Sequence, residues 1–106
     1  MNVNAFSMSS GEFFGFLRLE DSSVVLNASP IDSMEAKPHP APWVLVPANL
    51  DLETSVRQAL EESSKDARQK GMDYVYASPL KMGGKPYLAK EDGVAKQVID
   101  ILYLKK

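Results

Sequence analysis

The segment from Asp51 to Lys70 constrains the fold most, because it is the clearest stretch of helical periodicity in the chain. Asn49 or Asp51 is suited to cap its start, and Gly71 is suited to the left-handed conformation that often ends a helix. Acidic residues also precede basic ones by four positions, which stabilises an exposed helix by about 0.2–0.5 kcal/mol per pair. We therefore predict a long helix over 51–70, with an apolar stripe formed by Leu52, Val56, Ala59, Leu60 and Ala67.

Short apolar runs bounded by turn residues predict strands on both sides of this helix. Residues 12–19 and 24–26 flank the turn-like sequence 20–23, which indicates a β-hairpin. Gly83-Gly84 favours a second, tight hairpin, since glycine accepts the positive φ angles of such turns. Two further strands are predicted at Trp43–Val46, which we expect to be buried, and at Tyr74–Ala77.

The C-terminal segment is ambiguous. The apolar spacing from Val94 to Leu102 fits an amphipathic helix, and acidic residues before it and lysines after it suit the helix dipole. In contrast, Asp92-Gly93 is a hairpin signal, and the run Val98–Leu102 is rich in β-branched residues. We favour the helix and keep a strand as the alternative.

These elements predict one α+β domain over residues 1–106, with a single, mainly antiparallel sheet and two helices in the approximate order β-β-β-α-β-β-α. The strand at 43–46, the long helix and the strand at 74–77 would form a right-handed βαβ crossover. Residues 1–10 are expected to be poorly ordered, and the proline-containing segment 29–42 is expected to be a loop. With 44% hydrophobic and 25% charged residues, the chain has the composition of an ordinary globular domain.

Composition also excludes several classes of partner. The formal net charge of −2 and the scattered lysines lack the basic stripe of a nucleic-acid-binding protein, so nucleic acid is an improbable partner. No apolar run approaches the roughly 20 residues that cross a bilayer, and residues 1–10 do not resemble a signal peptide. The chain has no cysteine, which predicts a cytoplasmic location, with a disulfide-free secreted protein as the alternative.

The sequence offers little from which to build a reaction centre. His39 is the single histidine, and no serine lies in a nucleophile-elbow motif. The segment Lys81–Lys85 lacks both the first glycine and the hydroxyl residue of a phosphate-binding loop. Acidic pairs do not follow the alternating pattern of a calcium loop. We therefore expect no catalytic set, no cofactor and no metal.

Phe13, Phe14 and Phe16 are the first candidates for a binding surface, because strand alternation places them on both faces of one strand. A small domain with one sheet buries both faces only if a helix, another segment or a partner covers each of them. The simpler expectation is that the predicted 51–70 helix covers one face and the C-terminal segment or the loop covers the other. The functional hypothesis is a non-enzymatic protein-binding module, such as an inhibitor, an immunity-type factor or an adaptor, or a self-associating chain.

Two further candidates, His39 and Trp43, lie in and just after the proline-rich segment. An extended segment from Pro38 to Trp43 would be either a ligand for a proline-reading domain or, as we favour, a stiff connector that delivers Trp43 to the core. The alternative function is a small-molecule-binding domain or modest enzyme with an aromatic-lined pocket between helix and sheet. Its lining would be Tyr74, Tyr76, Tyr87, Trp43 and His39.

Overall fold

The structure is a computed structural model that describes residues 14–27 and 37–106. The predictions for residues 1–10, for Phe13 and for 29–36 lie outside these ranges. The described elements are β1 (Gly15–Arg18), β2 (Ser23–Leu26), β3 (Lys37–Pro40), β4 (Val44–Pro47), α1 (Leu52–Gln69), β5 (Tyr74–Pro79), β6 (Lys81–Met82), β7 (Lys85–Pro86), β8 (Leu88–Glu91) and β9 (Val94–Lys105).

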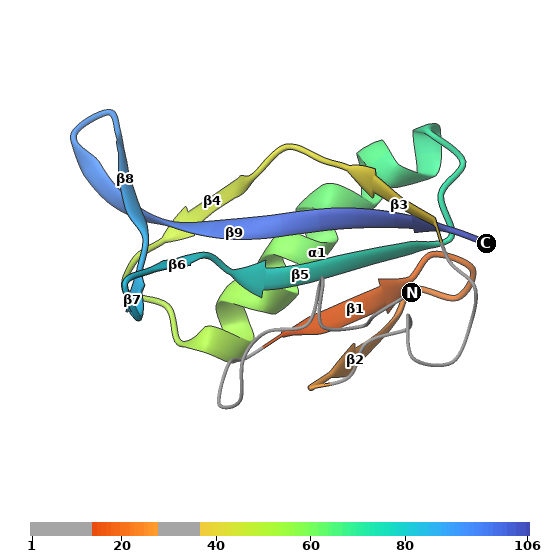
Figure 1. The fold of residues 1–106 in the computed structure, drawn as a ribbon, viewed down its shortest axis with the longest axis horizontal. Helices are drawn as coiled ribbons and strands as arrows, with labels where there is room; N and C mark the ends of the chain where they lie inside the picture. The colour runs from red at the N-terminus through yellow and green to blue at the C-terminus, as the bar shows by residue number, and fades with distance from the viewer. Residues whose placement is uncertain (1–13, 28–36) are drawn as a thin grey trace.

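Among the described residues, seven strands form one antiparallel sheet, and β6 and β7 form a separate two-stranded hairpin (Figure 1). The path through the main sheet is β2-β1-β5-β9-β3, and β4 and β8 also pair with β9. One edge of β9 pairs first with β8 and then with β5, while its other edge pairs first with β4 and then with β3. The predicted α+β class with a mainly antiparallel sheet is therefore confirmed, and β9 is the strand that the sheet is built around.

The predicted long helix is confirmed, with its ends stabilised as the sequence suggested. The Asp51 side chain accepts a hydrogen bond from the backbone N–H of Thr54 at 2.7 Å, which caps the first turn. Gly71 follows the helix with φ of +71°, a value that suits glycine. Glu53 and Arg57 are one of the pairs in which an acidic residue precedes a basic one by four positions, and they form an ion pair with 3.0 Å between Oε2 and Nε. None of the helices in the described part is long and apolar enough to cross a membrane.

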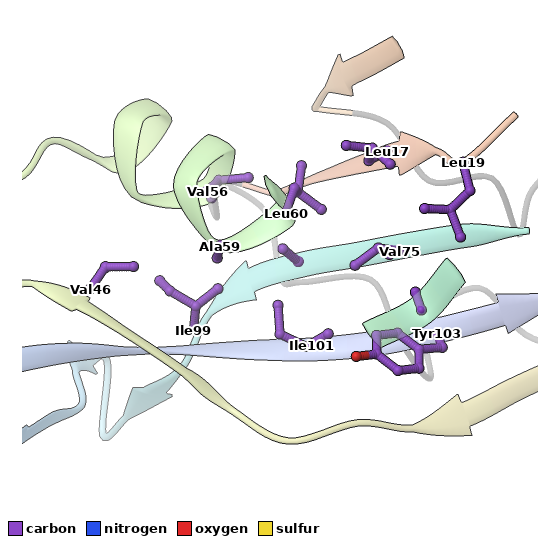
Figure 2. Close-up of a cluster of buried hydrophobic side chains, with 12 residues drawn as sticks. Leu17, Leu19, Val46, Val56, Ala59, Leu60, Val75, Ile99, Ile101 and Tyr103 are labelled. Carbon is purple, nitrogen blue, oxygen red and sulfur yellow. The ribbon is translucent and has the colours of Figure 1, made fainter. Parts of the chain in front are cut away.

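The main core lies between α1 and one face of the sheet (Figure 2). Val56 and Leu60 of α1 are fully buried against strand residues such as Val75 and Ile99, and each such side chain contributes roughly 1.5–3 kcal/mol on burial. A polar contact also lies between the layers, because Ser55 Oγ donates to Gln97 Oε1 at 3.4 Å and both residues are buried. A second, smaller cluster occupies the opposite face and contains Phe16, Tyr74, Tyr76 and Leu104.

The prediction of a second helix at the C-terminus is wrong, and the strand that we kept as the alternative is found. Asp92 and Gly93 have φ of 53° and 80°, so they form the tight turn that joins β8 to β9. A helix over this segment would bury one apolar stripe. In contrast, β9 is paired along both edges, and Val98 and Ile99 are completely buried. The β-branched residues therefore reflect a central strand.

The predicted loop over 29–42 is also wrong in part, because residues 37–40 form the edge strand β3. Prolines are tolerated there because their missing donors face away from the sheet. The backbone N–H of Asp73, on the β5 side, donates to the carbonyl of Leu104. Backbone groups of successive residues point to opposite edges of a strand, so those of Tyr103 point towards β3. Tyr103 pairs with His39, which leaves Pro38 and Pro40 at the outward-facing positions.

The expected βαβ crossover exists in a wider form. Both β4 and β5 run antiparallel to β9, so they run parallel to each other and α1 connects them. The two strands pair with opposite edges of β9 and are therefore not neighbours in the sheet. The crossover places α1 over the centre of the sheet and leaves the opposite face without a described helix (Figure 1).

Candidate functional site

The structure places the described phenylalanines in the second cluster and not on an exposed patch. Phe16 is 9% exposed and meets Tyr74 edge to face, with 5.7 Å between ring centroids. Phe14 is half-buried and lies 5.8 Å from the ring of Tyr76. Phe16 is therefore a core residue, and Phe14 packs beside the core.

His39 is exposed on β3, opposite Tyr103, on the face of the sheet that α1 covers. Within the described ranges, no hydrogen bond joins its imidazole to a serine or a carboxylate, and no cluster of three metal-ligating residues occurs. His39 is thus separate from Phe14, Phe16 and Trp43, which lie on the opposite face.

Trp43 does not enter the core, contrary to the favoured prediction, and is 55% exposed. It precedes β4, and its ring meets that of Tyr87 at 6.1 Å between centroids and 65° between planes. Tyr87 lies opposite Val98, whose backbone N–H donates to the Tyr87 carbonyl at 3.1 Å. The two rings come from opposite edges of β9, so together they bridge this strand above the buried Val98.

Asp100 completes this group, and we call Trp43, Tyr87 and Asp100 the Trp43 site. Asp100 is exposed and lies on the same face of the sheet, since Ile99 and Ile101 on either side point into the core beneath α1. Partial burial raises the pKa of Asp100 above the ordinary value of 3.8 and outweighs the backbone N–H of Ile101 and the indole of Trp43, which both act to lower it.

An interruption of the sheet edge explains why these groups meet. β3 ends at Pro40 opposite Leu102, and β4 begins at Val44 opposite Ile99, so residues 41–43 leave the edge of β9 without a strand partner. In a strand, the backbone groups of successive residues point to opposite edges. Val98 and Leu104 accept hydrogen bonds from the β5 side, so Ile101, which is three residues from each, points to the other edge and to this gap. The Ile101 N–H is close enough to the Asp100 carboxylate to act to lower its pKa.

Within the described residues, the side chains predicted to line the small-molecule pocket do not come together between helix and sheet. Tyr76 belongs to the cluster on the far face, and Tyr87 and Trp43 meet there as well. A hollow of about 340 Å³ is lined by Tyr74 together with charged residues that include Arg18 and Asp73. A broader groove of about 850 Å³ lies between α1 and the β1–β2 hairpin and is lined mostly by polar side chains.

Sequence reasoning singled out Trp43 and Tyr87 and missed Asp100. A signal was present, because Asp100 is the single charged residue in the run Val98–Leu102. Interpreted as a strand, this run places its one charge between apolar neighbours and on the opposite face from Ile99 and Ile101. Interpreted as a helix, the same residue looked like an ordinary solvent-facing position.

Searches of protein-family models, curated proteins and solved structures return no match for this chain. The candidate site therefore rests on the geometry of the chain itself.

Proposed function

We propose that this chain is a non-enzymatic protein-binding module that binds its partner through the Trp43 site and the sheet face around it. The observation that carries the proposal is the exposed tryptophan, which is held by a ring contact with Tyr87 and placed beside Asp100 by the register of β4 with β9. Tryptophan and tyrosine are enriched among the few residues that supply most of the energy of protein interfaces.

The fixed position of the ring supports this function. Association costs about 0.5–1.5 kcal/mol for each flexible side chain that becomes ordered, and an indole already held in place avoids most of that cost. Two neighbouring positions on the same face are apolar, since Leu45 lies beside Val98 and Val94 is 55% exposed. No described helix covers this half of the sheet (Figure 1), so the anchor is accessible to a partner.

The single tryptophan makes the proposal testable by fluorescence, because every change in indole emission reports on this site. A random peptide library is selected on the immobilised native protein and counter-selected on the Trp43→Ala variant at a temperature where circular dichroism shows both to be folded. The matched control is Val25→Ala, which removes an exposed apolar residue from the same face at the β2 edge.

We expect enriched peptides to shift the Trp43 emission saturably, to lose binding to Trp43→Ala and to bind Val25→Ala as they bind the native chain. Sedimentation at increasing concentration tests a second copy of the chain as the partner, with the same dependence on Trp43. The proposal fails if enriched peptides bind Trp43→Ala and the native chain equally and no self-association depends on Trp43.

A further inference from the structure

We infer that the Trp43 site recognises an arginine side chain of the partner, with the guanidinium stacked on the indole of Trp43 and hydrogen-bonded to the carboxylate of Asp100. This inference rests on the proposed function and adds the chemistry of the residue that is bound. It requires an accessible indole, an accessible carboxylate and a fixed distance between them.

The indole fulfils the first requirement. Trp43 is 55% exposed, and Tyr87 holds its ring on one side without covering it. The indole face is the strongest cation–π acceptor among the aromatic side chains, and arginine is the cation found there most often.

The carboxylate fulfils the second requirement. Asp100 is exposed, and a carboxylate offers about four acceptor positions to a donor that approaches from solvent. In the part of the chain that the structure describes, the ion pairs do not include Asp100. The nearest base on the same face of β9, Lys96, lies 3.9 Å from Glu91 and pairs with that residue.

The register of β4 and β9 fulfils the third requirement: Val44 lies opposite Ile99, so the next residues along, Trp43 and Asp100, lie side by side. A guanidinium is planar and carries its donors along its rim, so it can stack on the ring and donate to the neighbouring carboxylate at the same time. A lysine ammonium is a point charge without a stacking face. An apolar side chain placed here would cover the Asp100 carboxylate without giving it a hydrogen-bond partner. An acidic side chain would repel it.

The test uses defined probes in place of the unidentified partner. The ¹⁵N-labelled native protein is titrated with N-acetyl-arginine amide, with the neutral isostere N-acetyl-citrulline amide and with N-acetyl-lysine amide, while the single indole N–H resonance is followed by NMR. We expect a saturable shift with the arginine probe, roughly tenfold weaker binding of citrulline, and lysine between the two.

Two variants separate a direct contact from a general effect of charge. Asp100→Asn keeps the size of the side chain and is expected to remove the preference for arginine over citrulline. Glu20→Gln removes the same charge at the β1–β2 turn, where the Glu20 side chain is 88% exposed, and is expected to leave the preference unchanged. Equal binding of arginine and citrulline, or an unchanged preference in Asp100→Asn, overturns the inference.

The two proposals fail in different ways. If selected peptides bind at Trp43 but show no enrichment of arginine, the arginine inference is refuted and the protein-binding function stands. If the arginine probe binds in an Asp100-dependent manner but no peptide or second copy binds at Trp43, the cation site stands and the protein-binding function is refuted.

Discussion

Replacing Trp43 with alanine tests whether the indole is an anchored surface residue, as the Trp43 site requires. The residue is 55% exposed, so 45% of it is covered. A large aromatic side chain has up to about 250 Å² to bury, so roughly 110 Å² is lost from the packed surface. At about 25 cal/mol per Å², reduced because the unfolded chain already covers part of its apolar surface, this area corresponds to about 2 kcal/mol. The edge-to-face contact with Tyr87 adds about 1 kcal/mol.

The expected loss of about 3 kcal/mol is smaller than the 5–15 kcal/mol typical of a domain, so the variant should remain folded. The melting temperature should fall by more than roughly 10 °C. The assay is urea unfolding followed by far-ultraviolet circular dichroism, since the variant has no tryptophan to report by fluorescence.

Two results would refute the reasoning. A loss below about 1 kcal/mol would show that the indole does not pack on Tyr87 and is not held in place for binding. Complete unfolding of Trp43→Ala at room temperature would show that the ring belongs to the core, which would remove it as a docking residue. The Val25→Ala variant is the control, because a single exposed residue at the β2 edge should change stability by less than about 1 kcal/mol.

Two further predictions concern other parts of the fold. Ser55→Ala should lower the free energy of unfolding by about 1 kcal/mol, because it leaves the buried Gln97 oxygen without its donor. The double variant Ser55→Ala with Gln97→Leu should recover most of that loss in urea unfolding. A double variant as unstable as the sum of its single changes would contradict this. Hydrogen bonds from Lys70 and Tyr103 lower the pKa of Asp66 below 3.8, so its contribution is present above that pH and lost as the pH falls through the folded-state pKa. The stability difference between native protein and Asp66→Asn should therefore shrink in acid, and a constant difference across this range would disprove the assignment.

The elements specified by local chemistry were predictable from the sequence. The capping side chain of Asp51 and the glycine at 71 define α1 within a residue or two, because both act on neighbouring backbone groups. The turn at Gly83-Gly84 is formed as predicted, with Met82 opposite Lys85. Such signals depend on a few consecutive residues and need no knowledge of the rest of the fold.

The C-terminal strand was not predictable in the same way, because its choice depends on distant partners. Residues 94–102 fit a helical stripe, and the local signs of a strand were limited to the Asp92-Gly93 turn and the β-branched residues of 98–102. What decides for the strand is that β3, β4, β5 and β8 supply partners on both edges. The same pairing fixes the position of Asp100. Because the C-terminal segment was predicted to be a helix, Asp100 was not recognised as a site residue.

Trp43 was assigned to the core because it begins the short apolar run 43–46, which was interpreted as a buried strand. The interruption between β3 and β4 keeps Trp43 out of the core. Residues 41–43 leave the edge of β9 there, and the indole lies on the face of the sheet opposite α1. Prolines at 38, 40 and 42 indicated an extended segment but not where it would break from the sheet.

The position of β9 in the sequence has a consequence for folding during synthesis. β3, β4, β5 and β8 all leave the ribosome before β9, which is the strand that each of them pairs with. Until residues 94–105 emerge, these strands have unpaired edges, and only the β1–β2–β5 part of the sheet has its partners. The nascent chain should therefore stay open to chaperones and to mispairing until its last described strand is released, and then close in one cooperative step.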